Sequence, residues 1–155
     1  MSGQLDIRLA SPSDEVEIRQ CARNAYRPYV AEIGKEPAPM IADFQQLIAT
    51  GKVYVSPTAT GKVAGFIVFY PREDHMFLEN VAVQPSETHR GIGRAMIGYC
   101  EATALRLGLA SVQLYTNEKM TGNLTLYLHL GYQEVERRPE DGFNRVYFEK
   151  VLAPN

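Results

Sequence analysis

The sequence predicts an α/β (α+β) fold in one domain, residues 1–155, with a mixed sheet that carries helices on both faces. The chain has the length of a single domain, and its 45% hydrophobic and 22% charged residues are typical of globular proteins. The spacing of apolar residues changes repeatedly between two, the period of strands, and about 3.6, the period of helices. Glycine and proline stand at most of these changes, where elements begin or end.

The N-terminal third predicts one strand and two helices. Leu5, Ile7 and Leu9 alternate with polar residues, which indicates a half-buried strand. A helix then begins with Ser11 as its cap, Pro12 at the first helical position and Asp14 completing a capping-box-like pair. Its apolar residues are Ile18, Ala22, Ala25 and Tyr29, and it ends at Gly34, Pro37 and Pro39. The second helix, marked by Met40, Phe44, Leu47 and Ile48, ends at Gly51.

The rest of the chain alternates between strands and helices. Strands at 52–56 and 62–70 form a hairpin through the turn 57–61, and a turn at 71–74 leads to a strand at 76–83 that Pro85 ends. A helix runs from Gly91 to about Leu107, with an apolar stripe of Ile92, Met96, Tyr99, Cys100, Thr103 and Leu107. A strand at 110–116, a helix at 121–130 and strands at 132–137 and 145–151 follow. The predicted order is βααβββαβαββ, seven strands and four helices.

Composition excludes several classes of function. A formal charge of −2 and a pI near 5.9 argue against a nucleic-acid surface held by bulk electrostatics. Cys21 and Cys100 lie far apart and form no metal-type pair, and the three histidines, His75, His89 and His129, lack ligand spacing, so we expect no metal. The chain shows neither an apolar signal region at its start nor an apolar run of about 18 residues. We therefore expect a cytoplasmic protein without a membrane segment.

The most informative segment is the turn that leads into the helix at 91. A strand brings the chain to a loop, and Gly91 and Gly93 stand where the helix begins. Glycine lets the backbone approach a ligand closely, and the first helical turn leaves four N–H groups unpaired with about half a positive charge. Arg90 and Arg94 add full charges on either side. This arrangement suits a pyrophosphate.

Two common nucleotide motifs do not fit this turn. The Gly-Lys pairs at 51–52 and 61–62 are each followed by valine, where a P-loop needs serine or threonine. A dinucleotide fingerprint needs a third glycine or an alanine at Met96. An isolated Gly-x-Gly is most often only a helix start, so the turn alone does not identify a site.

Three motifs in register resemble the GNAT superfamily of acetyl-CoA-dependent N-acetyltransferases. Residues 88–93, Thr-His-Arg-Gly-Ile-Gly, match both glycines of the family signature [QR]xxGx[GA], with Thr88 at the Gln/Arg position. Residues 78–83 look like the family's fourth strand, and residues 127–132 look like its Y-x-x-x-G-[FY] element. The resemblance covers nearly the whole chain. It implies a mostly antiparallel seven-stranded sheet with about four helices, acetyl-CoA as co-substrate, and a homodimer.

The resemblance also assigns cofactor contacts. The strand segment Val81, Ala82 and Val83 would pair with the pantetheine arm in a V-shaped opening between the fourth and fifth strands. The pyrophosphate would be held by the amides of His89, Arg90, Gly91, Ile92, Gly93, Arg94 and Ala95. Relatives often carry an asparagine at the position of Met120. Asn117 and Asn123 lie nearby, and either could replace that contact.

Acetyl transfer from a thioester to an amine needs a neutral amine, a stabilised oxyanion and a departing thiolate. The resemblance makes Glu79 the candidate base, acting either through a water molecule or with a raised pKa. The alternative is that Glu79 is a solvated strand residue without a catalytic role. Tyr127 is the candidate general acid, since a phenol with a pKa of about 10 is protonated at neutral pH, and its alternative role is packing on the sheet. The Val81 N–H is the expected oxyanion donor. No nucleophile motif is present, which favours direct transfer.

The acceptor is less defined than the co-substrate. Tyr26, Tyr29 and Phe44 flank the proline-rich break between the first two helices, and we expect them mainly in the core. The resemblance implies that the segment joining these helices borders the acceptor site, so a minority of the three would line the substrate pocket. The acceptor would be a primary amine of a small molecule or a peptide. The alternative function is a catalytically silent domain of the same fold that binds or senses acetyl-CoA, and the presence of both Tyr127 and Glu79 favours the enzyme.

Overall fold

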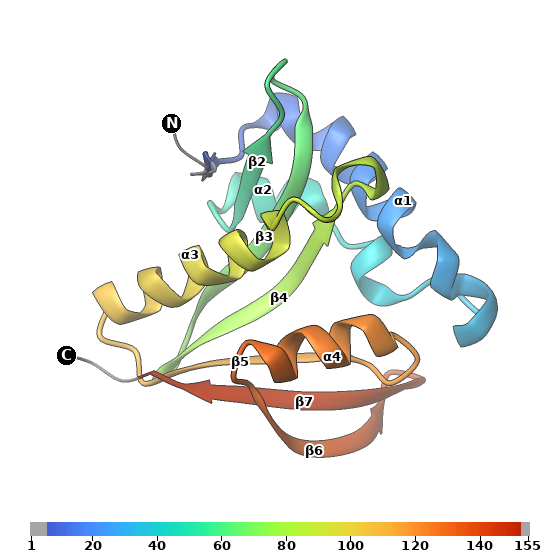
Figure 1. The fold of residues 1–155 in the computed structure, drawn as a ribbon, viewed down its shortest axis with the longest axis vertical. Coiled ribbons are helices and arrows are strands. Elements are labelled where there is room, and N and C mark those ends of the chain that lie inside the picture. The colour runs from blue at the N-terminus through green and yellow to red at the C-terminus, as the bar shows by residue number, and fades with distance from the viewer. Residues whose placement is uncertain (1–5, 153–155) are drawn as a thin grey trace.

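The structure is a computed structural model that describes residues 6–152 (Figure 1). Its strands are β1 (Arg8–Leu9), β2 (Val53–Pro57), β3 (Val63–Arg72), β4 (His75–Val83), β5 (Ser111–Asn117), β6 (Gln133–Glu140) and β7 (Phe143–Val151). Its α-helices are α1 (Glu15–Ile33), α2 (Phe44–Ala49), α3 (Ile92–Arg106) and α4 (Thr121–His129). Short 3₁₀ turns are η1 (Pro12–Asp14), η2 (Ala38–Met40) and η3 (Pro85–Glu87). The predicted order of elements is confirmed.

The seven strands form one sheet in the order β1-β2-β3-β4-β5-β7-β6. Neighbouring strands are antiparallel except β4 and β5, which are parallel. The predicted mixed, mostly antiparallel sheet is therefore confirmed. The hairpin of β2 and β3 closes through the predicted turn, where Gly61 has a positive φ of 87°.

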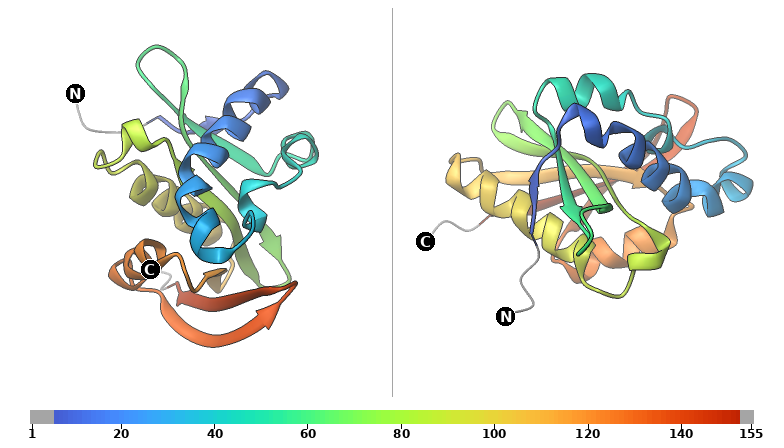
Figure 2. Two further views of the ribbon diagram at one scale, coloured as in Figure 1. Left: turned by 90° about the vertical axis from the view of Figure 1, so that its right-hand side faces the viewer. Right: turned by 90° about the horizontal axis from the view of Figure 1, so that it is seen from above.

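Helices cover both faces of the sheet, so the protein has two cores. One core lies under α3 and α4 and includes Met96, Leu114 and Phe148. The other lies under α1 and α2 and is built around Ile18 and Phe66. The view from above shows the strands between these two helical layers (Figure 2). Alternate residues of β3 enter opposite cores, which explains its nearly continuous apolar sequence.

The first helix begins and ends where the sequence predicts. The Ser11 N–H donates to the Asp14 carboxylate at 2.8 Å, as in a capping box, and Pro12 opens the 3₁₀ turn that runs into α1. The Arg8 guanidinium reaches the same carboxylate with bonds of 2.8 and 3.0 Å. Gly34 ends α1 in the left-handed conformation, with a φ of 91°.

Four local predictions are corrected. The first strand is only Arg8–Leu9, and Leu9 is 52% exposed because this strand lies at the sheet edge; Leu5 lies outside the described residues. Met40 belongs to the turn η2, since α2 starts only at Phe44, after its cap Asp43. Strand β3 continues through the expected turn residues Pro71 and Arg72, which pair with β4. Leu107 is 57% exposed, because it follows the last turn of α3 and turns away from the core.

A bulge in β4 shapes the centre of the sheet. Val68 pairs with Asn80 and Phe69 pairs with Leu78, so Glu79 is an extra residue without a partner on β3. On the other side, β4 pairs with β5 only from His75 to Phe77. A bulge bends its strand, which accounts for the way β4 turns away from β5 beyond this point (Figure 1). The two strands therefore diverge and leave backbone groups of β4 without a neighbouring strand.

Candidate active site

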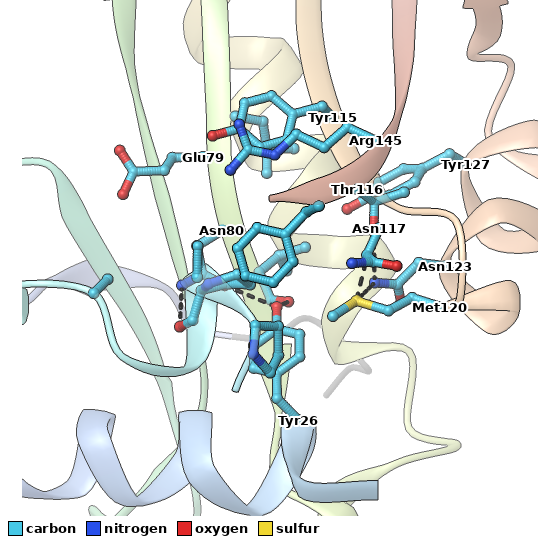
Figure 3. Close-up of a pocket in the computed structure, with 17 residues that line it drawn as sticks. Tyr26, Glu79, Asn80, Tyr115, Thr116, Asn117, Met120, Asn123, Tyr127 and Arg145 are labelled. Atoms are coloured by element: carbon cyan, nitrogen blue, oxygen red, sulfur yellow. Dashed lines mark hydrogen bonds between the residues drawn. The ribbon is translucent and has the colours of Figure 1, made fainter. Parts of the chain in front are cut away.

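A pocket lies between the diverging strands and reaches the loop between α1 and α2 (Figure 3). It is lined by Tyr26, Pro37, Ala38, Pro39, Ala42, Leu78, Glu79, Asn80, Val81, Tyr115, Thr116, Asn117, Met120, Asn123, Tyr127, Phe143 and Arg145. Both catalytic residues predicted from the sequence, Glu79 and Tyr127, therefore line one pocket. Glu79 lies on one side of it, and Tyr127 lies on the other with the two asparagines (Figure 3).

The backbone of Val81 faces this pocket. Its carbonyl oxygen accepts a hydrogen bond of 2.9 Å from the Tyr26 hydroxyl on α1, and therefore points away from β3. In an antiparallel strand the N–H and C=O of one residue point to the same side. The Val81 N–H is thus also directed away from β3, into the opening between β4 and β5.

Tyr26 and Asn80 link three elements beneath the pocket. The Tyr26 hydroxyl also contacts the Asn80 amide oxygen at 2.8 Å, and the Asn80 amide nitrogen donates to the Pro39 carbonyl at 3.0 Å. Tyr26 is 6% exposed and Asn80 3%. Burial raises the pKa of Tyr26, with a smaller contribution from neighbouring Tyr127, so its hydroxyl remains a donor. This network holds β4 against α1 and the loop that follows it.

Tyr127 is a buried phenol whose hydroxyl forms no hydrogen bond with the residues that the structure describes. The side chain is 4% exposed, and its ring packs on Tyr132 and Phe148 with centroid distances of 5.7 Å. Because it lines the pocket, its hydroxyl is free to act on a ligand there. Burial raises the pKa of Tyr127, and nearby Cys100 adds to this, so the phenol is protonated at neutral pH.

The two candidate asparagines both line the pocket but differ in their partners. The Asn117 side-chain oxygen accepts the Lys119 N–H at 2.9 Å and so belongs to the turn before α4. The Asn123 amide makes only long contacts, 3.4 Å to Thr116 Oγ1 and 3.6 Å to the sulfur of Met120. The Asn123 amide is therefore more available than that of Asn117 for a contact with the cofactor. Met120 itself is buried, 2% exposed.

Glu79 lies at the junction of this pocket with a second opening. The Tyr70 hydroxyl donates to its carboxylate at 2.7 Å. The second opening lies on the sheet surface over β4, β5, β7 and β6, and it shares Glu79, Tyr115 and Arg145 with the first pocket. Aromatic rings of Tyr70, Phe77, Tyr115 and Tyr147 follow one another across this surface at centroid distances of 5.3–5.7 Å. We call it the open sheet face.

The glycine turn opens α3 at the other end of β4. Gly91 caps the helix with a φ of 75°, and His89 also has a positive φ of 69°. A side chain at Gly91 would meet nothing within 4 Å, so the space above it is free for a ligand, and one at Gly93 would only touch Val83 at 3.7 Å. The turn fits an anion that lies against the backbone.

Two predicted contacts at this turn differ in detail. The Ala95 N–H donates to the Gly91 carbonyl at 3.0 Å, which makes it the first bond of the helix and leaves only the amides before it free. The Arg90 guanidinium forms an ion pair with Glu87 at 2.6 Å, whereas Arg94 is exposed on the first turn. Arg90 thus brings less free charge to this site than its position in the sequence indicated.

The three predicted substrate residues separate in the structure. Tyr26 lines the pocket, Tyr29 lies half-buried against Gly122, and Phe44 is fully buried on Phe66 in the core.

Among the pocket residues that were not predicted from the sequence are Asn80, Tyr115 and Arg145. For Asn80 the nearest indication was its place in the strand segment 78–83, next to Glu79. Arg145 had none, because only folding places β7 beside β5.

Two further features concern ligands and membranes. Within residues 6–152, no three histidine, cysteine, aspartate or glutamate side chains come together as metal ligands would. No helix in that range combines the length and the apolar character that crossing a membrane requires.

Comparisons with known proteins point to one family. The model of the acetyltransferase (GNAT) family matches residues 17–132. The [ribosomal protein bS18]-alanine N-acetyltransferase of Escherichia coli K12 is 30% identical over 81 residues, which are 52% of this chain and 55% of that protein. The chain thus matches about half the length of this curated relative.

Two solved structures have a similar fold over nearly their whole length. The PaiA N-acetyltransferase from Thermoplasma acidophilum, in complex with coenzyme A, has a TM-score of 0.76 at 17% identity and covers 96% of this chain and 99% of its own. The ribosomal-protein-S18-alanine N-acetyltransferase from Escherichia coli has a TM-score of 0.74 at 18% identity, with coverage of 98% and 96%.

Proposed function

The chain belongs to the acetyltransferase (GNAT) family, and we propose that it transfers the acetyl group of acetyl-CoA directly to a primary amine of a small molecule or peptide. One observation carries the proposal. The diverging strands leave two groups at the same pocket: the Val81 backbone and the buried Tyr127 hydroxyl, which has no hydrogen-bond partner within residues 6–152. An N–H and a protonated phenol are the two donors that acyl transfer from a thioester needs.

The glycine turn supports binding of acetyl-CoA. The free amides of Ile92, Gly93 and Arg94 at the start of α3 would hold the pyrophosphate, with the open space over Gly91 receiving it. The Val81–Val83 backbone, with which β5 does not pair, would pair with the pantetheine arm as with an added strand. Asn123 is the better candidate than Asn117 to replace the asparagine contact missing at Met120, because its amide is less engaged.

Each of three groups then has one role in the reaction. At pH 7 a lysine-like amine is neutral in only about one molecule in two thousand, so Glu79, through a water molecule, takes one proton from the ammonium before the neutral nitrogen attacks the carbonyl carbon. The nitrogen loses a second proton as the amide forms, and this proton balances the one that the leaving sulfur gains. The Val81 N–H stabilises the oxyanion of the tetrahedral intermediate. The C–S bond breaks, and Tyr127 donates its hydroxyl proton toward the sulfur. A phenol whose pKa burial has raised acts mainly as a hydrogen-bond donor to the charge that grows there.

Direct transfer is supported by the state of the two cysteines. Cys21 and Cys100 are fully buried, and burial raises the pKa of both thiols, that of Cys21 to about 12. The thiolate is the nucleophilic form of cysteine. Neither side chain is therefore available to carry the acetyl group as a covalent intermediate.

The open sheet face is the route we propose for the acceptor. It meets the pocket at Glu79, and it carries six carboxylates against three arginines, an excess that attracts a cationic amine. The carboxylates are Glu73, Glu79, Glu136, Glu140, Asp141 and Glu149, and the arginines are Arg72, Arg138 and Arg145. The Escherichia coli relative is named for acetylating an alanine of a ribosomal protein, so peptide N-termini belong among the acceptors to test.

The test is release of free thiol from acetyl-CoA in the presence of amines. The panel should include alkyl amines, amino acids, an aminoglycoside and short peptides with a free N-terminus, each measured against a blank without acceptor. Turnover with at least one amine, and a product acetylated on nitrogen by mass spectrometry, is expected. Tight binding of acetyl-CoA with no turnover on any acceptor would instead favour the silent binding or sensing domain.

A further inference from the structure

We propose that Tyr70 is a positioning residue that holds the Glu79 carboxylate turned toward the acceptor. The proposal rests on the proposed function, in which Glu79 accepts the proton of the amine. Its basis is the bond of 2.7 Å from the Tyr70 hydroxyl to Glu79 Oε1. This is the only hydrogen bond of the Glu79 side chain to the part of the chain that the structure describes.

The bulge in β4 explains why Glu79 needs such a partner. Tyr70 pairs with Phe77 across the strands, and Glu79 lies two residues further along β4, in the diagonal position that a tyrosine can reach. Glu79 itself has no partner on β3, so its backbone is less constrained than that of its neighbours. A hydrogen bond from the next strand restores the lost constraint at the side chain.

The Tyr70 ring is itself fixed on two sides. It packs edge-on against Phe77 with centroids 5.7 Å apart, and the Lys52 ammonium lies 4.5 Å from its centroid. Burial raises the pKa of Tyr70, and the bond to Glu79 raises it further, so the phenol stays a donor throughout the neutral range. A held donor on one carboxylate oxygen leaves the other oxygen for the acceptor or its water.

Other charged groups also surround this carboxylate. Tyr115 on β5 and Arg145 on β7 line the same pocket, and Arg72 lies near Tyr70 on β3. Glu79 in turn raises the pKa of Tyr115, after burial, which marks the two side chains as neighbours. Among these groups Tyr70 is the one bonded to Glu79. It is therefore the one whose removal should change the orientation of the carboxylate.

The experiment is a double-mutant cycle on turnover with the best acceptor of the panel. Tyr70→Phe removes the hydroxyl and keeps the ring, so kcat should fall about tenfold to a hundredfold, the worth of one hydrogen bond to a charged group, with KM for acetyl-CoA unchanged. In a Glu79→Gln background the same change should cost nothing further, because there is no base left to position. Tyr54→Phe is the matched control, since that half-buried tyrosine of β2 stacks on Phe69 and lines neither opening.

The split between kcat and KM separates positioning from a general structural role. The Tyr70 hydroxyl acts on the carboxylate that takes part in the reaction, so its removal should lower kcat while KM for the acceptor and Tm stay nearly unchanged, and Tyr54→Phe should change none of the three. Equal losses from Tyr70→Phe in both backgrounds, or wild-type turnover in Tyr70→Phe when Glu79→Gln is impaired, would overturn the role of Tyr70 alone. Full turnover in Glu79→Gln would instead remove the base role itself, and with it the inference.

Discussion

The Tyr26 hydroxyl donates a hydrogen bond of 2.9 Å to the carbonyl oxygen of Val81, and this contact fixes which way the centre of β4 faces. Tyr26 lies 55 residues earlier in the sequence, on α1, and is almost completely buried. The bond replaces one that a neighbouring strand would have supplied had β5 stayed alongside β4. The oxyanion donor proposed at Val81 thus depends on a helix that does not itself contact the reacting atoms.

Tyr26→Phe should therefore lower both stability and turnover. The change removes the single hydroxyl proton that two buried acceptors share, the Val81 carbonyl and the Asn80 amide oxygen. We expect the free energy of unfolding to fall by about 1–3 kcal/mol in denaturant titrations, with a lower kcat. Tyr29→Phe, on the same helix but half-buried, is the control and should change stability by less than about 0.5 kcal/mol. Equal effects of the two substitutions would contradict the proposed network.

Tyr127→Phe tests the general acid. The ring keeps its packing on Tyr132 and Phe148, so the fold should be unchanged and the affinity for acetyl-CoA nearly so. We expect kcat to fall by about 10²–10⁴-fold, the usual contribution of general acid–base catalysis, measured by steady-state kinetics with a good acceptor. Full turnover in this variant would make Tyr127 a packing residue and leave water to protonate the thiolate.

Gly91→Glu should abolish acetyl-CoA binding, measured by calorimetry and by the loss of the rise in Tm that the ligand produces. A side chain and a negative charge would enter the space that we assign to the pyrophosphate. Gly108→Glu is a close control, because Gly108 follows the other end of α3, has a φ of 76° against 75°, and is equally open. Both variants should lose about 1–2 kcal/mol of stability to backbone strain. Undiminished binding in Gly91→Glu would rule the site out.

Asp14 makes acid stability depend on the start of α1. The bonds from Arg8 are the main reason that the pKa of its carboxyl falls from about 3.8 to about 2, and the Ser11 N–H assists. A carboxyl with a lowered pKa in the folded state contributes stability above the pKa of the unfolded chain and loses it as pH falls toward 2. Asp14→Asn should thus be less stable than the wild type by about 1–2 kcal/mol at pH 7. The difference should shrink below pH 4 in thermal melts, and a gap that stays constant from pH 7 to pH 2 would contradict this assignment.

The homodimer stays a prediction from the family resemblance, and the cytoplasmic location stays a prediction from the sequence. Sedimentation at tens of micromolar should give twice the 17.4 kDa mass of the chain. A single species at the mass of one chain over that range would count against the dimer.

The sequence by itself determined the order of the elements and the position of the glycine turn. Both depend on local patterns: the apolar period sets the element type, and a capping residue such as Ser11 or a glycine such as Gly34 sets its limits. The three motifs at 78–83, 88–93 and 127–132 also lie within short segments. For that reason the fold class and the family followed from the residues alone.

Only the tertiary structure decided which side chains surround the pocket. Asn80 and Arg145 line it although neither was a predicted site residue, Phe44 lies in the core instead, and Tyr70 reaches Glu79 across a bulge. The Ala95 amide, expected at the pyrophosphate, is used by the helix itself. These outcomes depend on strand register and on the competition of each polar group for partners. The strand register and the choice of partners both depend on residues far apart in the sequence, so a local sequence pattern cannot predict them.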